Sequence, residues 1–255
     1  TDYRPKVPLR VYTSDEYLIG EFGEERRAVV GIDQVPTIMK QAILAAEDDR
    51  FYEHMGIDYI GIARAALANL SSGGKKQGAS TITQQVARNF FLSSEKTYTR
   101  KLYEALLSLK IENNLSKDQI LELYINQIFL GQRAYGFGAA AQIYFGKPLS
   151  QISIAEAAML AGLPKAPSAY NPIANPRRAK IRQEYVLRRM RELNFITEEQ
   201  QSQALKEPLI IKRELSEYAV NAEFVAEMAR QIVAEQFPED VYTRRLKVYT
   251  TLIKA

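Results

Sequence analysis

The sequence predicts a mainly α-helical protein with a few short strands near its two ends. Most segments between residues 36 and 205 repeat apolar residues every three or four positions, which is the period of an amphipathic helix. Residues 7–31 and 246–252 instead alternate apolar and polar positions, which predicts strands. The chain has 255 residues, 46% of them hydrophobic, so it can form a sizeable core in one large domain or two lobes.

The helix boundaries follow from local signals along the chain. Pro36 is expected to open the first helix, which runs to about Glu47. Asp58 suits the N-cap of a helix over residues 58–70, and Ser116-x-x-Gln119 is a capping box. Residues 154–163 are nearly all apolar but too few for a membrane span, so they predict a buried helix. Further helices are predicted over residues 79–91, 98–113, 139–145, 175–193, 197–205 and 217–236, with a strand over residues 209–211.

Composition excludes several classes of protein. Cysteine is absent, so disulfides, thiolate nucleophiles and zinc–thiolate sites are excluded. The net charge of +4 is too small to indicate nucleic-acid binding. The chain begins at Thr1, and no apolar run approaches the roughly 18 residues of a membrane span. We therefore expect a fragment whose membrane anchor, if there is one, lies upstream.

The stretch from Ala46 to Gly56 is the most informative part of the chain. An apolar helical run ends there in three consecutive acids, beginning with Glu47, and two aromatic residues and the only histidine, His54, follow. A carboxylate at the end of an apolar helix can be partly desolvated, which raises its pKa towards the range of a general base. A solvated acidic helix end is the alternative interpretation.

The helix over residues 79–91 has one apolar face and one polar face that is nearly uncharged. Hydroxyls and carboxamides suit a sugar or a phosphate better than an ordinary charged surface does. This face carries Ser80, Thr81, Gln84, Gln85 and Arg88. The residues that end this helix, Phe90-Phe91-Leu92, fit either a core position or a patch that touches a membrane.

Later segments add cations and loops. Arg100, Lys101 and Glu104 project from one side of their helix, because residues three or four apart share a face. A weak surface ion pair is the alternative to a binding role for these three residues. The proline-rich loop over residues 164–172 presents Lys165 and Ser168. Residues 131–138 are rich in glycine and offer backbone amides at close approach, without the ending of a P-loop.

Taken together, five segments resemble the peptidoglycan glycosyltransferase domain of class A penicillin-binding proteins, most closely the 1A type. The resemblance covers roughly residues 36–176, and its strength lies in the order of the five segments. They are Glu47-Asp48-x-x-Phe51-Tyr52-x-His54-x-Gly56, the run from Gly78 to Gln85, Arg100-Lys101-x-x-Glu104, Glu122-x-Tyr124-x-Asn126 continuing to Gly138, and the run from Ala157 through Lys165 to Pro172.

This resemblance implies a lysozyme-like, two-lobed helical fold around a long cleft. It divides the chain into membrane-proximal strands (residues 1–35), a glycosyltransferase domain (36–207) and a connector towards an absent transpeptidase domain (208–255). The implied reaction polymerises lipid II into β-1,4-linked glycan strands, with inversion at the anomeric carbon and release of polyprenyl diphosphate. The implied place is the outer, periplasmic face of the bacterial cytoplasmic membrane. Implied partners are lipid II, the growing lipid-linked glycan, the membrane surface and moenomycin-type inhibitors, with no nucleic acid.

The resemblance also implies roles for individual residues. Glu47 matches the general base and Glu104 a second essential carboxylate. Glu104 would either hold a divalent cation, Mg²⁺ or Mn²⁺, against the diphosphate or orient the two neighbouring cations. The expected substrate-binding residues are Asp48, Phe51, His54, Ser80, Thr81, Gln84, Gln85, Arg88, Arg100, Lys101, Tyr124, Asn126, Lys165 and Ser168.

Two other functions are compatible with the same residues. A lytic transglycosylase also relies on one glutamate, but a glycan-cleaving enzyme keeps its carboxylates within about 5–9.5 Å across one bond. A transferase must fit a donor and an acceptor, so we expect a larger separation of Glu47 from Glu104, and a neutral glycan needs no basic cluster. The third possibility is an inactive module that binds lipid-linked precursors.

Overall fold

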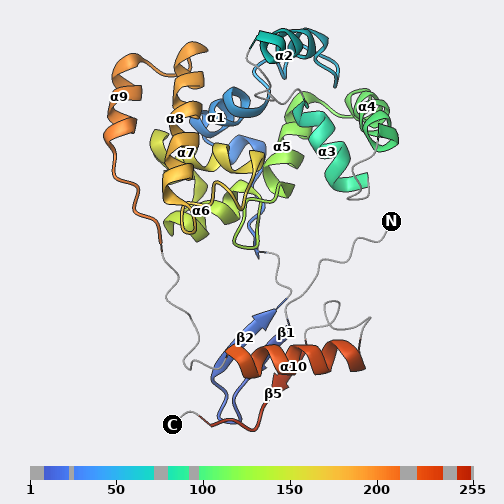
Figure 1. Ribbon diagram of the computed structural model, residues 1–255, viewed down its shortest axis with the longest axis vertical. Helices are drawn as coiled ribbons and strands as arrows, with labels where there is room; N and C mark the ends of the chain where they lie inside the picture. Colours follow the sequence, from blue (N-terminus) through green and yellow to red (C-terminus); the bar gives the residue numbers. More distant parts are fainter. Residues whose placement is uncertain are drawn as a thin grey trace. The chain divides into compact units, whose positions relative to one another are not determined.

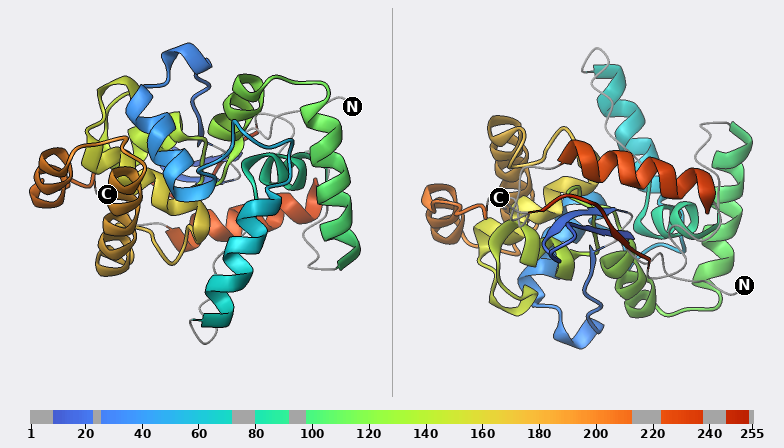
Figure 2. Two further views of the ribbon diagram at one scale, coloured as in Figure 1. Left: turned by 90° about the horizontal axis from the view of Figure 1, so that it is seen from above. Right: turned by 90° about the horizontal axis from the view of Figure 1, so that it is seen from below.

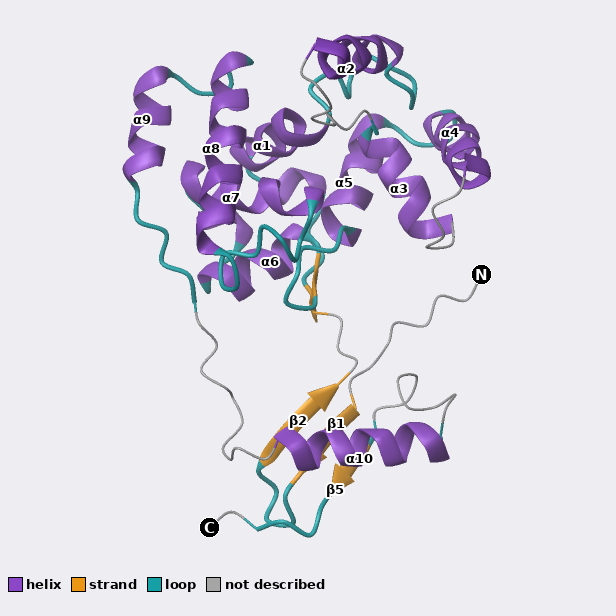
Figure 3. Ribbon diagram, viewed as in Figure 1, coloured by secondary structure: helices purple, strands orange, loops and turns teal. Residues whose placement is uncertain are grey.

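Helices build most of the computed structural model, which describes residues 9–22, 26–71, 80–91, 98–212, 223–237 and 246–253 (Figure 1). The predicted mainly α fold with a few short strands is confirmed (Figure 3). The chain divides into two compact units. The larger is Arg27–Lys212, and the smaller combines Thr1–Arg26 with Arg213–Ala255. The functional division into residues 1–35, 36–207 and 208–255 stays a prediction.

The larger unit is built from helices of nine to 17 residues. Helices α3 and α4 lie at one side of it and α8 and α9 at the other, with α1 and α5 between them (Figures 1 and 2). Its α-helices are α1 (Thr37–Glu47), α2 (Tyr59–Ser71), α3 (Ile82–Phe91), α4 (Tyr98–Glu112), α5 (Lys117–Gln127), α6 (Phe137–Phe145), α7 (Ile154–Gly162), α8 (Pro176–Glu192) and α9 (Glu198–Lys206). Its shorter elements are η1 (Ile32–Gln34), η2 (Leu149–Gln151), η3 (Leu163–Lys165), and β3 (Arg26–Arg27) paired with β4 (Ala134–Tyr135).

Side-chain caps fix where several helices begin. The predicted capping box at the start of α5 is present: Ser116 Oγ accepts a hydrogen bond from the Gln119 amide, and Gln119 Oε1 accepts one from the Ser116 amide. Equivalent boxes open α7 and α9, at Ser153 and Thr197. Each box satisfies amide groups that would otherwise lack partners at a helix start.

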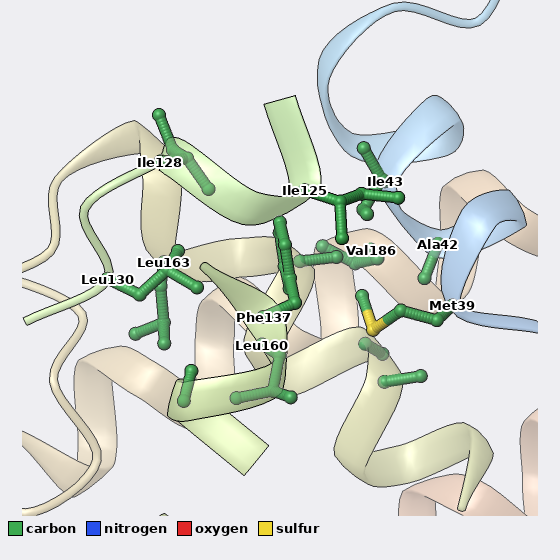
Figure 4. Close-up of a cluster of buried hydrophobic side chains, with 14 of the residues drawn as sticks. Met39, Ala42, Ile43, Ile125, Ile128, Leu130, Phe137, Leu160, Leu163 and Val186 are labelled. Carbon is green, nitrogen blue, oxygen red and sulfur yellow. The ribbon is translucent and has the colours of Figure 1, made fainter. Parts of the chain in front are cut away.

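The core of the larger unit packs α1 against α7 and α8 (Figure 4). Met39, Ala42 and Ile43 of α1 are fully buried there. Every residue of α7 except the first is buried, which confirms the predicted buried helix. Because α1 is held along its length by this packing, the residues at its C-terminal end project from a rigid support.

In its described residues, the smaller unit is a three-stranded sheet with one helix. Strand β1 (Leu9–Tyr12) pairs antiparallel with β2 (Leu18–Phe22) and parallel with β5 (Lys247–Tyr249). Val11 and Ile19 of the sheet are buried with Ala226 of α10 (Glu223–Gln236). The strand predicted near the C-terminus is thus present as β5, and it pairs with the N-terminal strand β1.

The strand predicted over residues 209–211 is wrong, because this segment pairs with none of the strands in the described part of the chain. The Lys212 amide donates to the Tyr144 carbonyl oxygen at the end of α6, at 2.7 Å. Leu209 and Ile211 pack against the helical core while Ile210 is 81% exposed, which explains the alternating pattern. The predictions for Ala79, for the side chains of Phe90 and Phe91, for Leu92 and for residues 217–222 lie outside the described residues.

Candidate active site

Glu47 is the last residue of α1, and its carboxylate lies between α3 and α8. The Gln85 side-chain amide donates to Glu47 Oε2 at 2.9 Å. The guanidinium of Arg182 on α8 approaches Oε1 to 3.7 Å, and the Glu47 side chain is only 10% exposed. Oε1 is buried and accepts no hydrogen bond from the described residues. One oxygen of this carboxylate is therefore fixed, and the other has no hydrogen-bond partner among the described residues.

Burial raises the pKa of Glu47 above its ordinary value, because a charged carboxylate loses its hydration there. The hydrogen bond from Gln85 and the positive charges of Arg182, Lys165 and Arg88 act in the opposite direction. The group is thus a carboxylate whose affinity for a proton exceeds that of an exposed glutamate. This is the property expected of a general base that works near neutral pH.

Asp48 anchors the residues that follow Glu47 to the start of α3. Its Oδ2 accepts a hydrogen bond from the backbone amide of Ile82, the first residue of α3, at 3.0 Å. Both Asp48 oxygens lie 3.0 Å from His54 Nε2, and both side chains are buried. A carboxylate at a helix N-terminus is favourably placed in the field of the helix. These contacts fix the loop after α1, and they use the hydrogen-bonding capacity of Asp48 inside the protein.

A second contact joins the same loop to α3 through Thr81. Its hydroxyl donates to the Gly56 carbonyl oxygen at 2.7 Å and also accepts the Gln84 backbone amide at 3.1 Å. Gly56 has a left-handed φ of +82°, and an added Cβ would lie 3.0 Å from the Ser108 carbonyl carbon and oxygen. Only glycine satisfies both conditions without strain.

Replacing Gly56 by alanine should destabilise the larger unit. The left-handed backbone alone costs about 1–2 kcal/mol for a residue with a Cβ, and the close contact with Ser108 adds to it. Urea denaturation followed by circular dichroism measures the change. Gly31→Ala is the matched control, because Gly31 has extended backbone and its added Cβ would have its nearest neighbour at 3.9 Å. Equal midpoints for the two variants would contradict this account.

Lys117 on α5 contacts the loop that follows α1. Its ammonium donates to Glu112 at 2.7 Å and to the His54 carbonyl oxygen at 2.6 Å, and it lies 4.4 Å from the centre of the Phe51 ring. The Thr83 hydroxyl donates to the same Glu112 oxygen at 2.6 Å. Phe51 is fully buried. Its burial favours a supporting role for this ring over direct contact with a ligand.

Glu104 of α4 forms a second, cationic group with its neighbours. Lys101 Nζ lies 2.8 Å from Glu104 Oε2, and Arg100 lies 3.4 Å from Oε1. Lys101 also donates to Ser80 Oγ at 2.9 Å and to Gln84 Oε1 at 3.5 Å. The Glu104 side chain is 1% exposed, whereas that of Lys101 is 46% exposed. A buried carboxylate thus holds a solvent-accessible cation.

Helix α3 lies between the two groups. Gln84 contacts Lys101, and the next residue, Gln85, contacts Glu47. Consecutive residues of a helix point about 100° apart, so the two carboxylates meet adjoining faces of the same helix. The structure therefore brings the predicted base and the predicted cations together on α3, on the polar face that the sequence indicated.

Two further predicted substrate-binding residues are largely buried. Tyr124 on α5 is 1% exposed, and burial together with the negative charge of Glu47 raises its pKa well above its ordinary value. The Asn126 side chain donates a hydrogen bond to the Val30 carbonyl oxygen at 2.8 Å and accepts one from the Val30 amide at 2.9 Å. These two bonds connect α5 to the segment that precedes α1. For Asn126 these contacts favour a supporting role over contact with a substrate.

The remaining predicted residues lie around Glu47. Lys165 in η3 and Arg88 in the last turn of α3 are close enough to lower the pKa of Glu47 by their charges. Lys165 and Ser168 are exposed, and the Ser168 carbonyl oxygen accepts from the Asn175 side chain at 3.1 Å. Lys165 is thus an exposed cation near the buried carboxylate, accessible to an anionic ligand.

The residues around Glu104 favour the orientation of cations over the binding of a metal ion. A divalent cation such as Mg²⁺ needs several oxygen ligands, but the neighbours of Glu104 are two cations. Within the described ranges, no group of three or more histidine, aspartate or glutamate residues is arranged to hold a metal ion by itself. The arrangement fits the second role predicted for Glu104, which is to orient Arg100 and Lys101.

Comparison with known proteins identifies the family. The family model described as Transglycosylase matches residues 15–191. The chain belongs to this family. It is 59% identical over 250 residues to penicillin-binding protein 1A of Neisseria flavescens and 58% identical to that of Neisseria meningitidis serogroup B, each alignment covering 98% of the chain and 31% of the relative. A crystal structure of penicillin-binding protein 1A from Haemophilus influenzae aligns with a TM-score of 0.60 and 32% identity, over 98% of this chain and 27% of that one.

These matches confirm the predicted resemblance to class A penicillin-binding proteins, and with it the prediction of a transglycosylase enzyme. The transglycosylase spans about a third of the length of the curated relatives it matches. In the described part of the chain, no helix combines the length and the apolar character that crossing a membrane requires.

One residue of the transglycosylase site was missed from the sequence. Arg182 lies in the helix predicted over residues 175–193 but is not among the predicted site residues, although its guanidinium lies 3.7 Å from Glu47 Oε1. Its neighbours on α8 include Arg177, Arg178, Arg188, Arg189 and Arg191. The useful signal is periodicity, because Arg182 is followed by Val186 and Met190 at four-residue intervals, which places it beside the buried face of α8.

Proposed function

We propose that this transglycosylase is a peptidoglycan glycosyltransferase that polymerises lipid II into β-1,4-linked glycan strands, with Glu47 as general base. The observation that carries the proposal is the pairing of two groups across α3. One is a buried carboxylate with an oxygen that lacks a hydrogen-bond partner, and the other is an accessible cation held by Glu104. A base and an anion-binding group are the two components that this reaction needs.

Glu47 is proposed to act on the acceptor sugar. Its Oε1 takes the proton from the 4-hydroxyl of lipid II. At the same time the oxygen of this hydroxyl forms a bond to the anomeric carbon of the lipid-linked donor strand. The bond from this carbon to the diphosphate oxygen breaks, and polyprenyl diphosphate leaves with the electron pair. Attack from the face opposite the leaving group inverts the anomeric carbon from α to β. Support comes from the burial of Glu47, which raises its pKa towards that of a working base.

The departing diphosphate is proposed to lie against Arg100 and Lys101. A diphosphate is a stable anion and leaves without being protonated, so the transition state needs preorganised cations more than it needs a proton donor. Lys101 fits this role because Glu104 and Ser80 orient it while nearly half of its side chain stays exposed. Arg88 and Lys165 would contact phosphate or sugar groups nearer to Glu47. No divalent cation is assigned a step.

The lipid tail of the substrate places the reaction at a membrane surface, and we propose the outer face of the cytoplasmic membrane. Helix α4, which carries the cations, supports this placement with exposed apolar side chains. Tyr98, Leu102 and Leu106 recur every four residues and are 97%, 60% and 55% exposed. A stripe of this kind suits the interface of a bilayer. Moenomycin-type inhibitors are expected to occupy the same site.

Purified chain supplied with lipid II should produce glycan polymer and should release no fragments from isolated cell-wall sacculi. Gel analysis of labelled lipid II and chromatography of soluble sacculus products measure the two activities, each with and without chelator. Polymer formation that persists in chelator is expected from the environment of Glu104. Sacculus fragments without polymer would instead identify a lytic transglycosylase, and lipid II binding without turnover would identify a non-enzymatic module.

A further inference from the structure

Arg182 reaches the end of α1 from the middle of α8. Its guanidinium Nη2 lies 3.7 Å from Glu47 Oε1, and the two side chains are 12% and 10% exposed. At this distance the two groups attract each other without a hydrogen bond between them. Partial burial strengthens the attraction, because water screens it less than at a surface.

Several contacts fix the Arg182 side chain where it lies. Its Nε donates to the Gly162 carbonyl oxygen at 3.4 Å, and its guanidinium lies 4.5 Å from the centre of the Tyr185 ring and 5.8 Å from that of Tyr170. A Cβ at Gly162 would stand only 2.8 Å from Arg182 Cγ. The glycine at the end of α7 therefore makes room for the arginine stem, and the aromatic rings hold its head.

We propose that Arg182 is a positioning residue that keeps Glu47 ionised while leaving Oε1 free to receive a proton. This inference rests on the proposed function of Glu47. Gln85 occupies Oε2, so a hydrogen-bonded cation on Oε1 would block the remaining oxygen. Arg182 instead supplies charge from a distance beyond hydrogen-bond reach. A shorter or more mobile cation at this position would either lose the charge effect or bond directly to Oε1.

The other charges around Glu47 do not duplicate this role. Lys165 and Arg88 act on Glu47 less strongly than Arg182 does, and Lys165 is exposed to screening by water. The only charged residue of α7, Glu156, is paired with Lys147 at 2.8 Å, and Asp49 is paired with Arg64 and Arg189. The groups that face Glu47 are thus Arg182 from α8, Lys165 from η3, Arg88 from α3, Tyr124 from α5 and the adjoining Asp48.

Loss of Arg182 should raise the pKa of Glu47 further, because burial would then be opposed by fewer charges. A general base works in its deprotonated form, so the acidic limb of the rate profile should move to higher pH. Arg182→Met should therefore lose about tenfold or more in kcat/KM for lipid II near pH 6, and distinctly less near pH 9. Arg182→Lys should keep more of the low-pH activity than Arg182→Met.

The measurement is the rate of polymerisation between about pH 5.5 and pH 9. Arg188→Met is the matched control on the same helix, because Arg188 is 61% exposed and also lies near the Tyr185 ring. If Arg182→Met fails to fold, Arg182→Gln removes the charge with a polar planar head. An equal loss at every pH, with the acidic limb unmoved, overturns the proposal and leaves a structural role. Failure of the proposed function is distinct, because wild type would then form no polymer at any pH.

Discussion

Replacing Glu47 by glutamine is expected to lower the rate of glycan polymerisation by about 10²–10⁴-fold, the contribution of a general base. The substituted side chain keeps its shape, and its carbonyl oxygen can still accept the hydrogen bond from Gln85. It cannot take a proton, so the acceptor hydroxyl stays a weak nucleophile. Binding of lipid II or of a moenomycin-type inhibitor should be largely kept, because the cations around the site are unchanged.

Two measurements separate chemistry from binding in this variant. Polymer formation under single-turnover conditions reports the chemical step, and fluorescence titration with labelled inhibitor reports the site. Glu53→Gln is the control, because Glu53 lies in the loop that follows α1 with a side chain 64% exposed, and it should polymerise as wild type does. Polymerisation by Glu47→Gln at a rate near that of wild type would remove Glu47 from the role of base.

The sequence was sufficient where the local pattern and the packing agree. Helix α7 is apolar at every position except Glu156, and the Ser116-x-x-Gln119 pattern predicts the capping box of α5. The apolar run before Glu47 likewise predicts a carboxylate at the edge of a core, and burial does raise its pKa. These features depend on neighbours in sequence, which is why they could be predicted.

Contacts between distant segments could not be predicted in the same way. Lys117 is 63 residues from His54, whose carbonyl oxygen it binds, and Arg182 lies on a helix where many residues are basic. Residues 209–211 have the alternation of a strand, but their neighbour is the end of a helix, so no ladder forms. In each case the deciding partner is set by the fold.

Motif resemblance also leaves the role of a residue open. Phe51 and Asn126 both belong to the motifs. In the structure the Phe51 ring packs against the Lys117 ammonium, and the Asn126 side chain forms hydrogen bonds with the Val30 backbone. A side chain that supports a site and one that touches a substrate give the same pattern in a sequence. Burial and hydrogen bonds separate them, because a group whose donors and acceptors are satisfied inside the protein has little left to offer a ligand.

Replacing Glu104 by glutamine is the second change with a large expected effect, a loss of about 10²–10³-fold in kcat, the scale seen when a preorganised electrostatic group is removed. The buried carboxylate lies between Arg100 and Lys101. Without its charge these adjacent cations repel each other and lose the orientation that meets the diphosphate. Steady-state kinetics with lipid II measures the loss, and the larger effect should be on kcat, because the charge of the leaving group grows in the transition state.

A double-mutant cycle with Lys101→Met tests how Glu104 acts. If Glu104 works by orienting Lys101, the double variant should lose little more than the worse single variant, because each change removes the same interaction. If Glu104 instead binds a divalent cation, the losses should multiply, chelator should inactivate wild type, and Glu104→Gln should need more Mg²⁺ for the activity it keeps. The neighbours of Glu104 favour the first outcome, since the positive charges of Arg100 and Lys101 beside its carboxylate would repel a divalent metal ion.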